Sequence, residues 1–165
     1  MSTAAATDRG WLLAAIGLSR LCPVSSSAYA VGAIIVDADG GELARGYSRE
    51  VLPTDHAEES VLAKAAVARL DLRHATLYTS LEPCTARRSR SRTCTELILA
   101  AGIPRVVFAM HEPPTLADCQ GAETLRAAGV EVIELPDLAP LVREVNAHLL
   151  GPGVRGVDRA GAHEL

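Results

Sequence analysis

Three side chains of the kinds that bind zinc stand close to the predicted starts of two helices. His56 begins one apolar helical pattern, and Cys84 and Cys94 lie before and at the start of another. One imidazole and two thiolates form a ligand set that suits zinc, and three protein ligands leave the fourth tetrahedral position open for water. Because an open position is typical of catalytic zinc sites, these residues predict a catalytic Zn²⁺ centre.

A carboxylate stands beside this ligand set. Glu58 follows His56 by two residues, where its side chain can reach a water molecule at the open position. Zinc lowers the pKa of bound water to about 7, and a nearby carboxylate can carry the released proton to a leaving nitrogen. Zinc deaminases share a His/Cys/Cys zinc, a Glu that is not a ligand, and the signature H-x-E followed by P-C-x-x-C. With Pro83 before Cys84, the sequence therefore predicts hydrolytic deamination of an amino-heterocycle.

The second half of that signature is stretched, because residues 85–93 separate the two cysteines where the signature has only two residues. This longer gap and its surroundings resemble the deaminase domain of the riboflavin-biosynthesis pyrimidine deaminases, within the cytidine deaminase superfamily. The likeness runs from about residue 28 to residue 150. It depends on five stretches, namely residues 31–36, 56–58, 79–84, 100–107 and 125–132.

The resemblance implies specific roles. His56, Cys84 and Cys94 bind Zn²⁺. Glu58 moves protons, the amide of Ala57 holds the edge of the base, and ammonia leaves from an aminopyrimidine that carries a ribosylamino phosphate. Many relatives also carry a C-terminal reductase domain, for which this chain is too short.

Two segments depart from the family pattern. The family has Asn-Pro before the V-G strand, with the Asn touching the substrate, where residues 27–30 here read Ser-Ala-Tyr-Ala. Tyr29 is therefore a candidate wall of the base pocket, or else a packing residue. The family loop usually reads G-R-T-P-P-C, whereas residues 87–94 here include four arginines. Guanidinium groups match phosphate geometry, so Arg88 and Arg90 are candidates for binding a substrate phosphate, the alternative being a solvated basic loop.

Hydrophobic periodicity predicts the elements that position these residues. We expect an α/β fold, a three-layer α/β/α sandwich with a five-stranded mixed sheet, in which the last two strands run parallel through a right-handed crossover. A Gly-rich end without periodicity predicts a deaminase domain over residues 1–150 and a flexible tail over residues 151–165. The expected helices are 8–21, 56–70, 93–101, 121–128 and 138–150, and the expected strands are 30–37, 42–48, 75–80, 105–110 and 130–135.

Composition limits the classes of partner. The 165 residues suit one domain, with 16 basic against 20 acidic residues and only 3% aromatic residues. An acidic chain with few aromatic side chains argues against nucleic-acid binding. With no apolar run of membrane length and no export signal, we expect a cytoplasmic protein without a membrane partner. Such a chain more often uses cysteines for metal binding than for disulfides.

Several alternatives stay open at this point. The substrate is a phosphoribosylated aminopyrimidine, or a free base or nucleoside such as cytosine, cytidine or guanine. Cys119 or His111 could complete a structural zinc site in a non-catalytic binding protein. Nucleic-acid editing is a third possibility. We expect a small-molecule substrate and a homo-oligomer, most simply a dimer.

Overall fold

The computed structural model of the chain describes residues 3–88, 90–113 and 119–150. The predicted tail, residues 151–165, lies outside the described residues. None of the helices within the described ranges combines the length and the apolar character that crossing a membrane requires.

A five-stranded mixed sheet forms the centre of the fold, as predicted. Its strands lie in the order β2-β1-β3-β4-β5. The central strand β3 pairs antiparallel with β1 and parallel with β4, and β4 pairs parallel with β5. The predicted parallel pairing of the last two strands is therefore confirmed. The strands are β1 (Gly32–Val36), β2 (Glu42–Tyr47), β3 (Thr76–Leu81), β4 (Arg105–Met110) and β5 (Glu131–Glu134).

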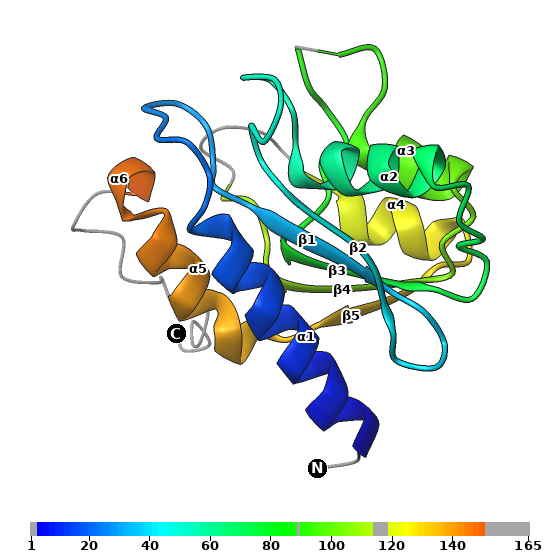
Figure 1. Ribbon diagram of the computed structural model, residues 1–165. Helices are drawn as coiled ribbons and strands as arrows, with labels where there is room; N and C mark the ends of the chain where they lie inside the picture. Colours follow the sequence, from blue (N-terminus) through cyan, green and yellow to red (C-terminus); the bar gives the residue numbers. More distant parts are fainter. Residues whose placement is uncertain (1–2, 89, 114–118, 151–165) are drawn as a thin grey trace, which may run out of the picture.

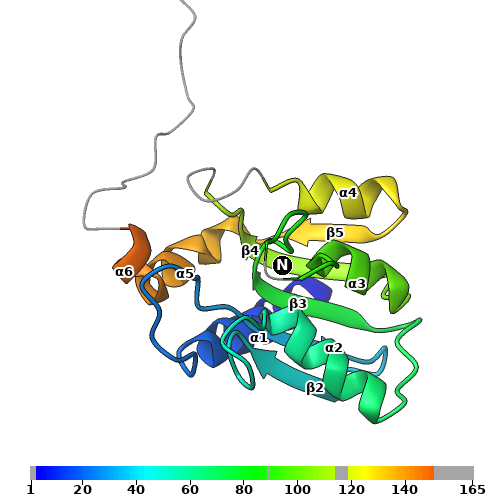
Figure 2. The same ribbon diagram turned by 90° about the horizontal axis from the view of Figure 1, so that it is seen from above.

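Helices cover both faces of the sheet and complete the predicted three layers (Figure 1). Three of them, α2, α3 and α4, lie side by side on one face, and α1 and α5 lie on the other (Figure 2). Their bounds are α1 (Thr3–Ser19), α2 (Ala57–Val67), α3 (Cys94–Ala100), α4 (Gly121–Ala127), α5 (Ala139–Val145) and α6 (Ala147–Leu150).

Aliphatic side chains fill the space between the layers. Every residue of β1 is buried, as expected for a strand covered on both faces. Gly32 at its start allows α1 to approach, because a Cβ atom there would lie 2.0 Å from the Ala15 carbonyl oxygen. The sheet is thus held closely between its helices, and the ends of its strands are fixed in space.

The last predicted helix, residues 138–150, is broken in the structure. A 3₁₀ turn (Pro136–Leu138) leads into α5, and Asn146 (φ −102°, ψ 18°) separates α5 from α6. Its backbone N–H and its side-chain Nδ2 both donate to the Val142 carbonyl oxygen, at 3.1 and 3.0 Å. Asn side chains compete in this way with helical backbone bonds, which gives a physical reason for the break.

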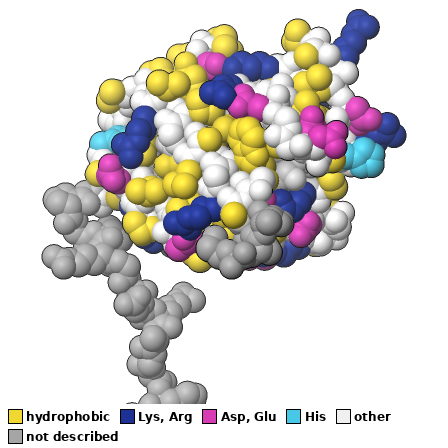
Figure 3. Space-filling model, turned by 60° about the horizontal axis from the view of Figure 1, so that its bottom comes forward, with side chains coloured by type: hydrophobic (Ala, Val, Ile, Leu, Met, Phe, Trp, Pro, Cys, Tyr) yellow, Lys and Arg dark blue, Asp and Glu magenta, His cyan; other side chains and the backbone are white. Residues whose placement is uncertain are grey.

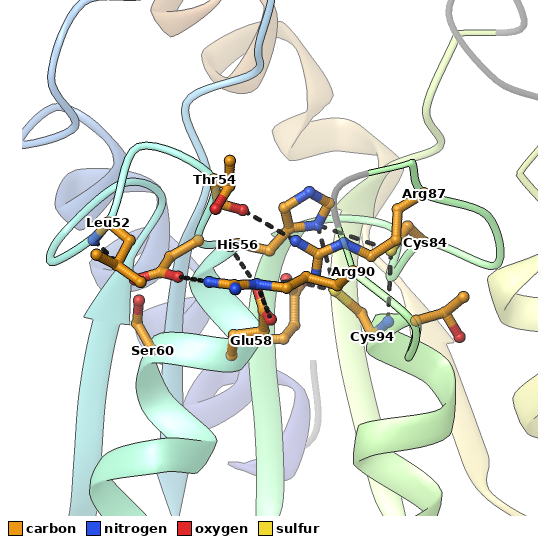
Figure 4. Close-up of polar contacts among 12 residues, drawn as sticks. Leu52, Thr54, His56, Glu58, Ser60, Cys84, Arg87, Arg90 and Cys94 are labelled. Atoms are coloured by element: carbon orange, nitrogen blue, oxygen red, sulfur yellow. Dashed lines mark hydrogen bonds and ion pairs between the residues drawn. The ribbon is translucent and has the colours of Figure 1, made fainter.

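The strand directions bring several chain ends to one edge of the sheet. The start of β1 and the ends of β2, β3 and β4 all lie there, as their registers require. The starts of α2 and α3 lie at the same edge (Figure 4). Ligands of open α/β sheets bind outside the carboxyl ends of parallel strands, so this edge is where a site is expected.

Candidate metal centre and substrate cavity

The three predicted metal ligands converge at this edge (Figure 4). Cys84 Sγ lies 3.6 Å from His56 Nδ1, and Cys94 Sγ lies 3.3 Å from the same nitrogen. With Zn–S bonds of about 2.3 Å and Zn–N bonds of about 2.0 Å, a tetrahedral site separates sulfur from nitrogen by about 3.5 Å. The donor atoms and their spacing therefore fit zinc.

Local hydrogen bonds fix the three ligands on their elements. His56 is the residue before α2, and its backbone N–H donates to Glu59 Oε2 at 3.0 Å. Cys94 is the first residue of α3, and its N–H donates to Cys84 Sγ at 3.4 Å. The Cys84 carbonyl oxygen accepts from both the N–H and the hydroxyl of Thr95, each at 3.2 Å. The loop that carries Cys84 is thus tied to the start of the helix that carries Cys94.

The two cysteines differ in their protonation. The hydrogen bond from the Cys94 thiol lowers the pKa of Cys84, and that same bond, together with burial, raises the pKa of Cys94. Burial alone lowers the pKa of His56, but the bond with Cys84 and the charge of Glu58 outweigh it and raise that pKa. The cluster therefore concentrates negative charge, and its side chains share protons. A divalent cation bound there would displace those protons.

Glu58 stands next to the ligand cluster without belonging to it. Its carboxyl is only 3% exposed. Thr79 Oγ1 donates to its Oε1 at 2.7 Å, and Cys94 Sγ lies 3.4 Å from its Oε2. Burial raises the pKa of this carboxyl, the largest of several effects. One oxygen is therefore anchored to β3 while the other faces the metal ligands.

The alternative fourth ligands lie elsewhere. Both ring nitrogens of His111 are engaged by carboxylates, with Nδ1 2.7 Å from Glu82 Oε2 and Nε2 3.0 Å from Glu134 Oε2. The Cys119 thiol donates to the Pro83 carbonyl oxygen at 3.3 Å. Across the part of the chain that the structure describes, the metal-ligating cluster has three members. A three-residue donor set is the pattern of catalytic zinc sites.

A cavity of about 1050 Å³ opens beside the cluster. Tyr29 and Arg88 line it, together with Glu58 and Cys84. Ala57, by contrast, is fully buried and its side chain packs in the hydrophobic core. The predicted pocket wall and one of the predicted arginines therefore border the same cavity as the metal ligands.

The arginines of the loop after Cys84 have different partners. Arg87 Nη1 lies 2.8 Å from Glu59 Oε2, and Arg90 pairs with Asp55 at 2.9 Å and with Glu59 at 3.5 Å. Arg88 is exposed, lines the cavity and has no ion pair among the described residues. Arg87 and Arg90 thus hold the loop against the start of α2 (Figure 4). Arg88 lines the cavity instead.

Two residues of the site were missed by the sequence reasoning. Thr79 is a fully buried polar residue on β3, and its hydroxyl holds Glu58. Glu112 follows β4 and lines the cavity, and burial raises its pKa to about 6. A signal existed for Glu112, because it follows a strand that ends beside β3 in a parallel pair.

Comparison with known proteins agrees with this geometry. Residues 6–110 match the family described as the cytidine and deoxycytidylate deaminase zinc-binding region. A diaminohydroxyphosphoribosylamino-pyrimidine deaminase of Schizosaccharomyces pombe is 36% identical over 126 residues, which are 75% of this chain and 31% of that protein. The riboflavin biosynthesis protein RibD of Aquifex aeolicus is 41% identical over 102 residues, covering 62% of this chain and 27% of RibD. The chain thus spans less than a third of the length of these relatives.

Solved structures share the same fold. The diaminohydroxyphosphoribosylaminopyrimidine deaminase/5-amino-6-(5-phosphoribosylamino)uracil reductase of Thermotoga maritima superposes with a TM-score of 0.71 and 32% identity, over 84% of this chain and 39% of that one. The Rib2 deaminase of Aspergillus oryzae, in complex with DARIPP, gives a TM-score of 0.73 and 25% identity over 84% of this chain and 89% of that one. Since the family match covers more than half of the chain and includes His56, Glu58 and both cysteines, the chain belongs to the zinc-binding cytidine and deoxycytidylate deaminase family.

Proposed function

We propose that this chain is a zinc-dependent hydrolytic deaminase whose substrate is a phosphoribosylated aminopyrimidine, as in riboflavin biosynthesis. The main support for the reaction type is the donor set of His56, Cys84 and Cys94, with the buried carboxyl of Glu58 beside it. The substrate class draws support from relatives, among them the Schizosaccharomyces pombe deaminase and the Aspergillus oryzae enzyme in complex with DARIPP.

In the proposed site, His56 Nδ1 and the sulfurs of Cys84 and Cys94 hold the metal. Zinc supplies Lewis-acid activation, which lowers the pKa of water to about 7. Glu58 Oε2 accepts a proton from the attacking water and later delivers it to the amino nitrogen that leaves as ammonia. Overall, the carbon–nitrogen bond of the amino group breaks and a carbon–oxygen bond from water forms.

Two features of Glu58 suit this role. The bond from Thr79 fixes the position of the carboxyl, so Oε2, which faces the metal ligands, needs no reorientation during the reaction. Burial raises the pKa of this carboxyl and so favours its protonated form, which suits a group that takes up a proton and later releases it.

The remaining contacts concern substrate recognition. We assign Arg88 to the phosphate, because it lines the cavity and has no ion pair among the described residues. Tyr29 forms a wall of the base pocket. The backbone amide of Ala57, the first residue of α2, is assigned to the base edge. Arg90 does not contact the phosphate in this proposal, because its charge is paired with Asp55. It affects substrate binding by holding the loop that carries Arg88.

Ammonia release tests this proposal directly. The purified, zinc-loaded chain is assayed with the phosphoribosylated aminopyrimidine, with its dephosphorylated form, and with cytosine, cytidine and guanine. We expect turnover of the phosphorylated compound, with a higher KM for the dephosphorylated one. Turnover of only free bases or nucleosides would contradict the substrate assignment. A zinc-loaded chain that releases no ammonia from any of these compounds would contradict deamination itself.

We also propose that the chain acts in the cytoplasm as a homodimer that does not bind nucleic acid. An apolar groove of about 500 Å³ between α2 and α3 supports self-association. Basic and acidic side chains are interspersed on the face shown in Figure 3, which is unlike the basic stripe of a nucleic-acid binder. Light scattering tests the dimer, and titration with RNA and single-stranded DNA at low salt tests the absence of binding.

A further inference from the structure

Residues 28–31 form one wall of the cavity, and they precede the strand ladder of the sheet. Tyr29 and Val31 both line the cavity, whereas β1 begins at Gly32. Tyr29 and Ala30 are buried, at 8% and 7% exposure. Buried backbone N–H and C=O groups require hydrogen-bond partners, and residues outside a ladder must find them on side chains or loops. The groups that bond this segment therefore set the shape of the cavity.

Asn146 supplies these partners for Ala30, which lies 116 positions earlier in the chain. Its Oδ1 accepts from the Ala30 N–H at 2.7 Å, and its Nδ2 donates to the Ala30 carbonyl oxygen at 3.1 Å. The side chain is completely buried. Figures 1 and 2 both show the break between α5 and α6 beside the segment that leads into β1. The amide thus bonds both polar groups of one residue, as a neighbouring strand would.

Arg49 bonds the carbonyl of the same peptide unit, the one between Tyr29 and Ala30, whose N–H donates to Asn146. Its Nη1 donates to the Tyr29 carbonyl oxygen at 2.9 Å, and its backbone N–H donates to the Asp55 carbonyl oxygen at 2.8 Å. Asp55 directly precedes His56, so Arg49 connects the cavity wall to the loop that carries a metal ligand. The wall is therefore held at two neighbouring residues. Arg49 connects Tyr29 to the loop before His56, and Asn146 connects Ala30 to the C-terminal helices.

We propose that Asn146 is a positioning residue for substrate binding, acting by fixing the backbone of Ala30 and with it the Tyr29 wall of the cavity. It is not among the residues that line the cavity, so it acts through Ala30. Its kinetic consequence rests on the proposed deaminase function. Because Asn146 does not bond His56, Cys84, Cys94 or Glu58, its loss alters the fit of the substrate and leaves proton transfer in place.

The test compares Asn146→Ala with a matched cavity-forming variant of the same helix. Val142→Ala removes a side chain that is equally buried, at 1% exposure, yet keeps the Asn146 bonds to Ala30. For Asn146→Ala we expect at least a tenfold higher KM, a kcat within threefold of the wild type and unchanged zinc content. Hydrogen exchange at the Ala30 amide, followed by mass spectrometry of peptides spanning residues 28–32, should be at least tenfold faster. Val142→Ala should show neither change at a temperature where both variants are folded.

Two outcomes would overturn the inference. One is an Asn146→Ala protein with wild-type KM or with wild-type exchange at Ala30. The other is a Val142→Ala protein that raises KM as much as Asn146→Ala does, since that would reduce the effect to general destabilisation. If the wild type itself releases no ammonia, the proposed function fails, whereas the exchange measurement still reports on the Asn146 contact.

Discussion

Replacing Glu58 by Gln removes the proposed proton carrier and leaves the shape of the side chain unchanged. The amide oxygen can still accept from the Thr79 hydroxyl, which donates to Oε1 at 2.7 Å, but the amide cannot take up a proton. A positioned general acid–base group contributes a factor of about 10² to 10⁴, so we expect kcat to fall by that factor. This corresponds to about 3 to 5 kcal/mol of transition-state free energy.

The stability of the protein should not fall with its activity. Burial raises the pKa of Glu58 by penalising the charged carboxylate, and a neutral amide avoids that penalty. We therefore expect Glu58→Gln to keep about one zinc per chain and a melting temperature no lower than that of the wild type. The assays are ammonia release, elemental analysis and thermal unfolding on one preparation.

Glu123→Gln is the matched control, because Glu123 is an exposed acid in the first turn of α4. Its kcat should equal that of the wild type. An unchanged kcat in Glu58→Gln would refute the role of Glu58 in proton transfer. Loss of zinc together with activity would instead make Glu58 a ligand, which contradicts the geometry described above.

Three further predictions concern metal binding, stability and substrate affinity. Cys94→Ser should lower zinc content well below one per chain after gel filtration, because Cys94 is one of three donors; full retention would contradict its assignment. Asp8→Asn should reduce the free energy of unfolding at pH 7 by about 2 to 3 kcal/mol, because Asp8 is buried and both of its oxygens accept charge-assisted hydrogen bonds from Arg105 at 2.8 Å. The bond with Arg105 lowers the pKa of Asp8, so this stabilisation is present above about pH 4 and is lost as the pH falls through the folded-state pKa. Urea unfolding at several pH values should show this pH dependence in the wild type and not in Asp8→Asn. Arg88→Ala should raise KM about tenfold for a phosphorylated substrate and not for its dephosphorylated form, since one charge-assisted contact is lost. Arg90→Ala should affect both forms alike, and equal effects of the two variants would contradict the phosphate assignment.

Local signals predicted most of the fold. The strand over residues 105–110 has the predicted bounds, because Pro104 and the polar His111 end an apolar run on either side. The capping box at Thr93 likewise marks the start of α3. In such segments, burial and local hydrogen bonds favour the same structure, so periodicity alone is sufficient.

The metal ligands could be predicted from residue type, since few other roles bring one His, two Cys and a nearby Glu to the starts of helices. The ion-pair partners of the arginines in the loop after Cys84 could not be predicted from the sequence. Arg88 and Arg90 are equivalent in the sequence, but Arg90 pairs with Asp55 and Arg88 lines the cavity. Which arginine meets an acid depends on how the loop folds over α2, and no spacing rule encodes that contact.

The break at Asn146 escaped prediction for a related reason. Its surroundings have helical periodicity, and the competing bonds are made with Ala30, far away in the chain. A long-range contact of this kind overrides local propensity only after the sheet and helices have come together. Thr79 was missed for the same reason. Threonine is common in strands, and only the folded structure shows that this hydroxyl donates to Glu58.

X-ray absorption spectroscopy at the zinc edge tests the central claim most directly. The purified chain is loaded with one equivalent of zinc, freed of excess metal and measured in solution. The donor set of His56, Cys84 and Cys94 predicts two sulfur ligands at about 2.3 Å and two nitrogen or oxygen ligands at about 2.0 Å. A shell of nitrogen and oxygen alone, a four-ligand shell with three or four sulfurs, or a chain that retains no zinc would contradict the proposed centre.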